Sequence, residues 1–178
     1  MKTLADLETD FLFNHPQFCE VLAEWHHSEW GRSSGALLCD SIGLLDRSKS
    51  ASHLPLVIVA FRKVPVGMAM LVEHDMPSRK DLTPWLSALY VPTSERNNGV
   101  GSCLVARVVA EAWRLAYKQI YLFTSDRVGF YNNLDWQVLE KMHYRNSSVA
   151  IMIKSSINLG KLAETDRQDD PSGNNQQR

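Results

Sequence analysis

The segment between residues 85 and 116 places the strongest constraint on the fold of this chain. Residues 85–91 form an apolar run that is stopped by Pro92, and a loop with Gly99 and Gly101 follows. After the loop, apolar residues recur on one helical stripe: Leu104, Val105, Val108, Val109, Ala112, Trp113 and Ala116. The run predicts a buried strand and the stripe predicts an amphipathic helix, so we expect a strand–loop–helix unit here.

The other segments surround this unit with short strands and a few helices. We expect strands at residues 56–61, 66–72, 120–124, 136–144 and 148–154, with a further strand near residues 3–7. Helices are expected at about residues 16–30, ended by Gly31, at 36–47, and from a cap at Ser125 or Asp126 to Leu134. The first two strands should pair as an antiparallel hairpin, and the last two should turn at residues 145–147. This order of elements predicts a mixed α/β sheet flanked by helices.

Length and composition favour one domain without a nucleic-acid or membrane partner. Of the 178 residues, we expect 1–158 to form the folded unit and the polar segment 159–178 to be a flexible tail. The net charge of -1 gives no general attraction to nucleic acid or an anionic membrane. The apolar runs are too short to span a bilayer and the N-terminus lacks a signal-peptide pattern, so a cytoplasmic protein is expected. Cys19, Cys39 and Cys103 form no zinc-binding pattern, so no metal is expected.

The loop before the central helix has the properties of an anion-binding site. The first N–H groups of a helix lack intrahelical acceptors and carry the positive end of the helix dipole. Gly99 and Gly101 allow an anion to approach the backbone closely, and Arg96 adds a positive charge. A P-loop is excluded because no Lys-Ser/Thr pair follows Gly101, and a dinucleotide fingerprint is excluded because residue 104 is Leu. From the glycine spacing alone, a plain helix start is an equal alternative.

Two motifs together resemble the GNAT superfamily of N-acetyltransferases. The first, Arg96-x-x-Gly99-x-Gly101 between a strand and an amphipathic helix, resembles the acetyl-CoA motif of that superfamily. One helix and one strand later, Phe130-Tyr131-Asn132-Asn133-Leu134-Asp135-Trp136 resembles its second signature. The motifs, their spacing and the strand order agree over roughly residues 54–154. The resemblance implies a mostly antiparallel sheet in which two central strands splay apart.

Two residues depart from the family pattern. Asn97 and Asp135 stand at positions where the family usually has Gly. Asn and Asp are the residues that best tolerate a left-handed backbone after Gly, so both departures are compatible with the motifs. Both are nevertheless changes that can weaken the affinity for the cofactor.

The resemblance also implies a cofactor site and catalytic residues. Acetyl-CoA is the implied co-substrate, with its pantetheine arm bound like an added strand to the backbone of Leu89, Tyr90 and Val91. Its pyrophosphate is implied to lie against Arg96, Asn97, Asn98, Gly99, Val100, Gly101 and Ser102. Tyr131 occupies the position of the general acid for the departing thiolate. Glu73 corresponds to a position that supplies a base in some members, and Asp75 and Asp81 are neighbouring candidates.

The implied reaction is transfer of an acetyl group to a primary amine, with a small-molecule amine favoured as the acceptor. Two alternatives stay open: an N-terminal or lysine acetyltransferase acting on a protein or peptide, and an acyl-CoA-binding module without catalysis. We expect the acceptor near residues 30–34 and 145–147. Trp25, Trp30 and Trp85 either line its pocket or, as we favour, belong to the core. A homodimer is a further alternative.

Overall fold

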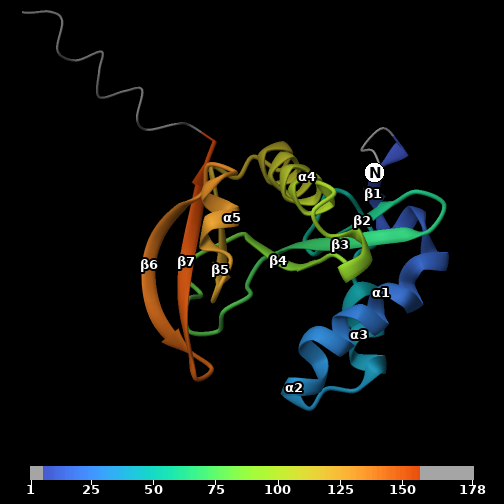
Figure 1. Ribbon diagram of the computed structural model, residues 1–178, viewed down its shortest axis with the longest axis horizontal. Helices are drawn as coiled ribbons and strands as arrows, with labels where there is room; N and C mark the ends of the chain where they lie inside the picture. The colour runs from blue at the N-terminus through green and yellow to red at the C-terminus, as the bar shows by residue number, and fades with distance from the viewer. Residues whose placement is uncertain (1–5, 157–178) are drawn as a thin grey trace, which may run out of the picture.

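One seven-stranded sheet organises the part of the chain described by the computed structural model, residues 6–156 (Figure 1). The strands are β1 (Glu8–Phe11), β2 (Leu56–Phe61), β3 (Pro65–Val72), β4 (Trp85–Tyr90), β5 (Gln119–Thr124), β6 (Gln137–Tyr144) and β7 (Ser147–Ser155). They lie in the order β1-β2-β3-β4-β5-β7-β6. Every neighbouring pair is antiparallel except β4 and β5, which are parallel. The predicted mixed, mostly antiparallel sheet is confirmed.

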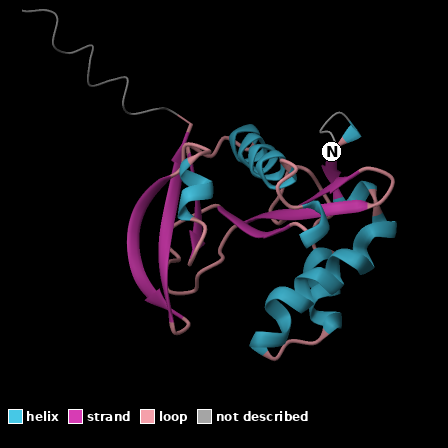
Figure 2. Ribbon diagram, in the orientation of Figure 1, coloured by secondary structure: helices cyan, strands magenta, loops and turns pink. Residues whose placement is uncertain are grey.

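Helices cover both faces of this sheet (Figure 2). They are α1 (Cys19–His26), α2 (Arg32–Ser34), α3 (Leu38–Leu45), α4 (Val100–Arg114) and α5 (Val128–Asn132). Single 3₁₀ turns at Leu12–Asn14, Pro16–Phe18 and Thr93–Glu95, and a π-helical turn at His27–Gly31, complete the helical segments of the described residues.

The alternation of side chains along β3 explains this layering. Ala69 and Leu71 point to the face covered by α4, where they join one buried apolar cluster. Met68 and Met70 point to the opposite face, where they pack with Leu22 of α1 and other buried side chains of a second cluster. Because successive side chains of a strand face opposite sides, a continuous apolar run can bury both faces of a sheet. The central strands are therefore held between α4 on one side and α1 with α3 on the other.

The sheet opens between its two parallel strands. β4 and β5 are paired only through Trp85 and Tyr121, and beyond this point they diverge. On its other edge β4 has a bulge opposite β3: Met70 pairs with Ser87 and Met68 with Tyr90, so Ala88 and Leu89 oppose a single residue. Ala88 has a positive φ of 49°, and a bulge of this kind bends the strand that carries it. The predicted splay of two central strands is confirmed.

Several predicted boundaries were wrong for identifiable physical reasons. Gly31 does not end the first helical segment, because the chain continues through the π-helical turn and α2 to Gly35, whose φ of 74° stops it. The short helix α5 has no side-chain cap; the Oγ1 of Thr124 instead accepts a hydrogen bond from the Arg127 amide, at 3.1 Å. The first strand is Glu8–Phe11, after the predicted range, and the predicted tail 159–178 lies outside the described residues.

Candidate active site

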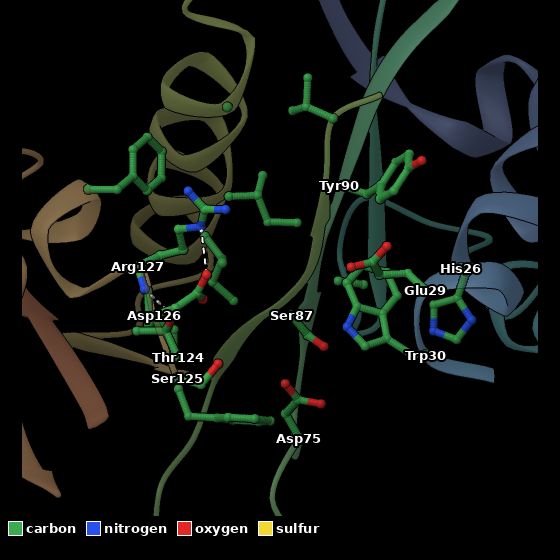
Figure 3. A pocket seen from close by; sticks show the side chains of 18 of the residues that line it. His26, Glu29, Trp30, Asp75, Ser87, Tyr90, Thr124, Ser125, Asp126 and Arg127 are labelled. Carbon is green, nitrogen blue, oxygen red and sulfur yellow. Dashed lines mark hydrogen bonds and ion pairs between the residues drawn. The ribbon is translucent and has the colours of Figure 1, made fainter. Parts of the chain in front are cut away.

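A cleft of about 930 Å³ occupies the opening between β4 and β5. Its lining comes from β4, the end of β5, the loop before α4, α5, and the helical segment around residues 26–44. Figure 3 shows Thr124, Ser125, Asp126 and Arg127 on one wall and His26, Glu29 and Trp30 on the other, with Ser87 and Asp75 between them. In open α/β sheets, ligands bind where neighbouring strands part at their carboxyl ends, so this cleft is the candidate site.

The N-terminus of α4 forms one end of the cleft. The helix begins at Val100 and follows Gly99, whose φ is 78°. Its first described hydrogen bond joins the Cys103 amide to the Gly99 carbonyl at 3.0 Å, and no described side chain caps this end. The amides of Val100, Gly101 and Ser102 therefore have no acceptor within the helix. Because Gly99, Gly101 and Ser102 line the cleft, this end can hold an anion.

The residues before α4 give the loop its shape. Arg96 donates from Nε to the carbonyl of Val91 at 3.0 Å, which ties the loop back to the end of β4. Asn97 has a φ of 62°, so the Asn that replaces the usual Gly does adopt a left-handed backbone. Arg96 and Asn97 line the cleft, whereas Asn98 is turned to the Glu95 carbonyl and Val100 is buried in the core. The structure thus brings most of the predicted loop residues to one site.

Neither a left-handed backbone nor a close contact with neighbouring atoms requires glycine at position 101. A Cβ built on it would be 3.5 Å from the Phe130 ring and 3.9 Å from Val91, both ordinary van der Waals distances. Its φ is not in the left-handed region, where glycine is favoured. The space beside Gly101 is therefore open to the cleft, which lets a ligand approach the backbone closely.

Tyr131 lies in α5 at the junction of the cleft and the core. Its side chain is 7% exposed, and its ring packs edge-on against Phe130 and Trp136 with centroids 5.0 and 6.0 Å away. Burial, with a smaller contribution from the charge of Asp126, raises the pKa of Tyr131 to about 12. The phenol is therefore protonated throughout the neutral range and lines the cleft as a hydrogen-bond donor.

Glu73 lies outside this cleft. It directly follows β3 and is in phase with Ala69 and Leu71, which face α4. Its exposed side chain lines a separate pocket of about 270 Å³ at the end of α4, together with residues such as Leu115 and Tyr117. The structure thus does not bring Glu73 together with Tyr131.

Asp75, two residues further on, does line the cleft. Its half-buried carboxylate lies beside the Ser87 side chain of β4 (Figure 3). Burial raises the pKa of Asp75, while the Ser87 hydroxyl and the charge of Arg145 act in the opposite direction. Asp81, the other neighbouring candidate, is exposed and paired with Arg79 at 2.8 Å, away from the cleft lining. A carboxylate in this setting can accept a proton from a group bound in the cleft.

The helical wall opposite carries a group of aromatic side chains. Tyr90 of β4 contacts Trp25 and Trp30, with ring centroids 5.3 and 6.4 Å away, and His26 contacts Trp30 at 5.4 Å. The Nδ1 of His26 shares a hydrogen bond of 2.9 Å with the hydroxyl of buried Ser41. Burial, with a smaller effect of His27, lowers the pKa of His26 and favours its neutral form.

Of the three tryptophans considered from the sequence, only Trp85 has a purely structural position. It is fully buried, and its Nε1 donates to the Leu82 carbonyl at 2.7 Å. Trp30 lines the cleft. Trp25 does not line it but packs against Tyr90, which does. The predicted acceptor regions also reach the cleft, through residues such as Gly31, Ser34 and Arg145.

Within residues 6–156, no group of His, Cys, Asp and Glu side chains is arranged to hold a metal ion. Over the same range, no helix has both the length and the apolar character that crossing a membrane would require.

Comparisons with known proteins agree with this geometry. Residues 15–136 match the model of the acetyltransferase (GNAT) family, whereas a search of curated proteins found no match. The fold resembles aminoglycoside 6'-acetyltransferase type Ii, with a TM-score of 0.66 and 19% identity over 84% of this chain and 97% of that one. It also resembles yncA of Salmonella typhimurium, solved with acetyl-CoA, with a TM-score of 0.68 and 14% identity. That match covers 86% of this chain and 95% of the other.

A third solved structure of the same fold is the NatC complex bound to Gag peptide and CoA. It gives a TM-score of 0.64 and 12% identity over 85% of this chain and 99% of that chain. At such identities these likenesses concern the fold, whereas the family model covers more than half of the sequence. This chain belongs to the acetyltransferase (GNAT) family.

Proposed function

We propose that this chain is an N-acetyltransferase that moves an acetyl group from acetyl-CoA to a primary amine of a small molecule. The observation that carries the proposal is the continuous cleft from the N-terminus of α4 to Tyr131, between two strands that part. Membership of the acetyltransferase family supports the type of reaction. The solved structures with acetyl-CoA and CoA support the choice of donor.

The residues at the α4 end fit the phosphates of acetyl-CoA. The amides of Val100, Gly101 and Ser102 would donate to the pyrophosphate, and Arg96 and Arg127 line the same cleft. The open space beside Gly101 leaves room for phosphate oxygens next to the backbone.

The edge of β4 fits an extended pantetheine arm. Beyond Trp85 this edge has no strand partner within the described residues, and Leu89, Tyr90 and Val91 line the cleft there. Unpaired backbone groups of this kind can bind an extended ligand in the manner of an added strand.

In the proposed reaction, the amine nitrogen attacks the carbonyl carbon of the thioester. The ammonium form first releases one proton to solvent, because only the neutral amine has a lone pair for the attack. A C–N bond then forms, the C–S bond breaks with its electron pair leaving on the sulfur, and the nitrogen loses one further proton. Tyr131, with a pKa of about 12, is a much weaker acid than a thiol with a pKa near ~8.5, so full proton transfer to sulfur would cost about 5 kcal/mol. We therefore assign Tyr131 the role of a hydrogen-bond donor to the developing thiolate.

Asp75 is the carboxylate that we assign to the amine. Glu73 lines another pocket, whereas Asp75 lies in the cleft next to β4. Its raised pKa brings its basicity closer to neutral pH, where a general base is most effective. Asp75 would accept the proton that the amine loses, directly or through one water.

The similar aminoglycoside acetyltransferase structure supports a small amine, while the NatC complex with its peptide supports the rival peptide acceptor. The aromatic side chains of the helical wall favour a small amine over a peptide, because Trp30 and Tyr90 form a compact group in the cleft.

The test is incubation of the protein with acetyl-CoA and either small amines or peptides, while free thiol is followed. We expect amine-dependent thiol release with small amines. Faster release with peptides would favour the protein acetyltransferase, and tight acetyl-CoA binding without any amine-dependent release would favour a non-catalytic binding module.

A further inference from the structure

The two ends of the cleft differ in chemistry. At one end, Arg96 and the open amides at the N-terminus of α4 suit an anionic ligand, while Arg127 nearby is paired with Asp126 at 3.1 Å. The far end is lined by Glu29, Trp30 and Tyr90 on the side of the helices (Figure 3). A ligand that fills both ends should therefore be negative at the first and apolar or positive at the second.

The rings at the far end are held in place by one another. Tyr90 lies 5.3 Å from Trp25 and 6.4 Å from Trp30, the latter in an edge-on arrangement, and His26 lies 5.4 Å from Trp30. Such contacts fix the orientation of Trp30 before any ligand arrives. The faces of Trp and Tyr rings attract cations, and the attraction grows when the site is sheltered from water.

Glu29 brings a negative charge to this aromatic group. It precedes Trp30 in the π-helical turn His27–Gly31, and its exposed carboxylate has neither an ion pair nor a hydrogen bond within residues 6–156. The turn depends on Gly31, because a Cβ there would lie 2.6 Å from Nδ1 of His27. Single π-helical turns often occur at functional sites, where they change the direction of side chains.

Two other charged side chains that line the cleft interact with neighbouring groups. The carboxylate of Asp40 accepts a hydrogen bond from the Leu37 amide at 2.8 Å. The positive charge of Arg145 acts on Asp75, whose carboxyl pKa it lowers. Glu29 is thus the carboxylate at this end that is left to meet a charge on the ligand.

We propose that the acceptor is a diamine or polyamine, whose second ammonium group lies between the Glu29 carboxylate and the rings of Trp30 and Tyr90. This inference rests on the proposed function, because it places the reacting amine beside Asp75. The second amino group takes no part in the bond changes and keeps its proton, since an alkylamine has a pKa near ~10.4. A monoamine would leave Glu29 without a partner.

Putrescine and butylamine provide the matched pair for the test, because they have the same carbon chain and differ in the second ammonium group. After correction for its two equivalent amines, we expect putrescine to have the higher kcat/KM by roughly 3- to 30-fold. In Glu29→Gln the ratio should fall towards one. Glu24→Gln is the matched control, because Glu24 is exposed in α1 and is not part of the cleft lining, and it should keep the ratio.

A calorimetric titration of putrescine into the CoA-bound protein gives a second readout that needs no turnover. Binding should weaken in Glu29→Gln and in Trp30→Leu, and Trp30→Phe should retain more of it, since Phe keeps an aromatic face. Equal kcat/KM for both amines, unaffected by Glu29→Gln, would overturn the inference and leave the acetyltransferase intact. Putrescine binding that depends on Glu29, with no thiol release from any amine, would overturn the proposed function instead.

Discussion

The hydroxyl of Ser87 lies beside the carboxylate of Asp75 and acts to lower its pKa, and this proximity brings β4 together with the loop that follows β3. Ser87 stands immediately before the bulge at Ala88, where β4 turns away from its parallel neighbour. The distortion that opens the cleft is therefore adjacent to the residue that lies beside the Asp75 carboxylate. The geometry of the strand and the chemistry of the site are coupled at this point.

Asp75→Asn should lower kcat/KM by about 10²- to 10⁴-fold, the usual range for loss of a general base. The amide keeps an oxygen for the Ser87 hydroxyl but cannot take a proton from the amine. Steady-state thiol release measures the loss, and acetyl-CoA affinity should change little because Asp75 is not among the residues proposed to hold the phosphates. Glu73→Gln is the matched comparison, and a larger loss there would return the base to Glu73.

The same substitution should change how stability depends on pH. The pKa of Asp75 is raised in the folded protein above 3.8, mainly by burial, so the folded state binds more protons than the unfolded state just above that pH. The contribution of Asp75 to stability is therefore complete below pH 3.8 and is lost as the pH rises through its folded pKa. Denaturant unfolding at pH 4 and pH 7 should show Asp75→Asn gaining stability relative to the wild type at pH 7. A constant difference would contradict the assigned shift.

Tyr131→Phe should reduce kcat by roughly 10- to 100-fold, as expected for one hydrogen bond to a charged group. The affinity for acetyl-CoA should change little, because the ring and its contacts with Phe130 and Trp136 remain. Since the pKa of Tyr131 is about 12, its ionisation should produce no fall in kcat below about pH 11. A pH profile of kcat in the wild type and in the variant tests both statements.

Gly101→Glu should weaken acetyl-CoA binding by at least about 100-fold, because like charges brought together at a binding site cost several kcal/mol. Binding is measured by calorimetry, which does not depend on turnover. Gly43→Glu makes the same change at an exposed position of α3 with nothing within 4 Å, and it should leave binding intact. Unchanged affinity in Gly101→Glu would refute the assignment of the phosphate loop.

The strand, loop and helix at one end of the cleft were predictable from the sequence because their determinants are local. A strand, a loop with Gly99 and Gly101, and an amphipathic helix follow one another, and the helix N-terminus needs no distant residue to expose its amides. Tyr131 belongs to a second local motif. Even the departure at Asn97 was consistent with the motif, because its φ of 62° is one that Asn tolerates.

The opposite wall of the cleft depends on tertiary packing and was less predictable from the sequence. Asp75 and not Glu73 reaches the cleft because of the side of the sheet that each side chain faces and the path of the loop after β3. The spacing of these residues in the sequence reveals neither of the two. That Glu29 lines the cleft does not follow from the sequence, because a π-helical turn has no clear sequence signal and Gly31 favours a helix end there. The wall that carries Glu29 reaches the cleft only because α1 packs on the sheet through residues such as Leu22.

Asp135 stands where the family usually has Gly, and the effect of this departure on stability can be tested. Its φ is 60°, and its side chain is 94% exposed and 3.7 Å from Lys154, so the charge pair contributes little. Asp135→Gly should be more stable than Asp135→Ala by roughly 1 kcal/mol, because a left-handed backbone is unfavourable for Ala and not for Gly. In a chain of this length, that difference corresponds to about 2–4 °C in Tm, which is measurable by thermal unfolding.

Asn133, in the same turn, provides the control with the opposite sign. It is exposed and has a φ of -67°, which every residue type adopts readily. Here Asn133→Ala should be more stable than Asn133→Gly by about 0.5–1 kcal/mol, because Gly has more conformational freedom to lose on folding. If the Ala and Gly variants rank in the same order of stability at both positions, the left-handed backbone of Asp135 does not determine which residue is more stable there. Opposite orders would explain why the family position usually holds Gly and why Asp is an acceptable replacement.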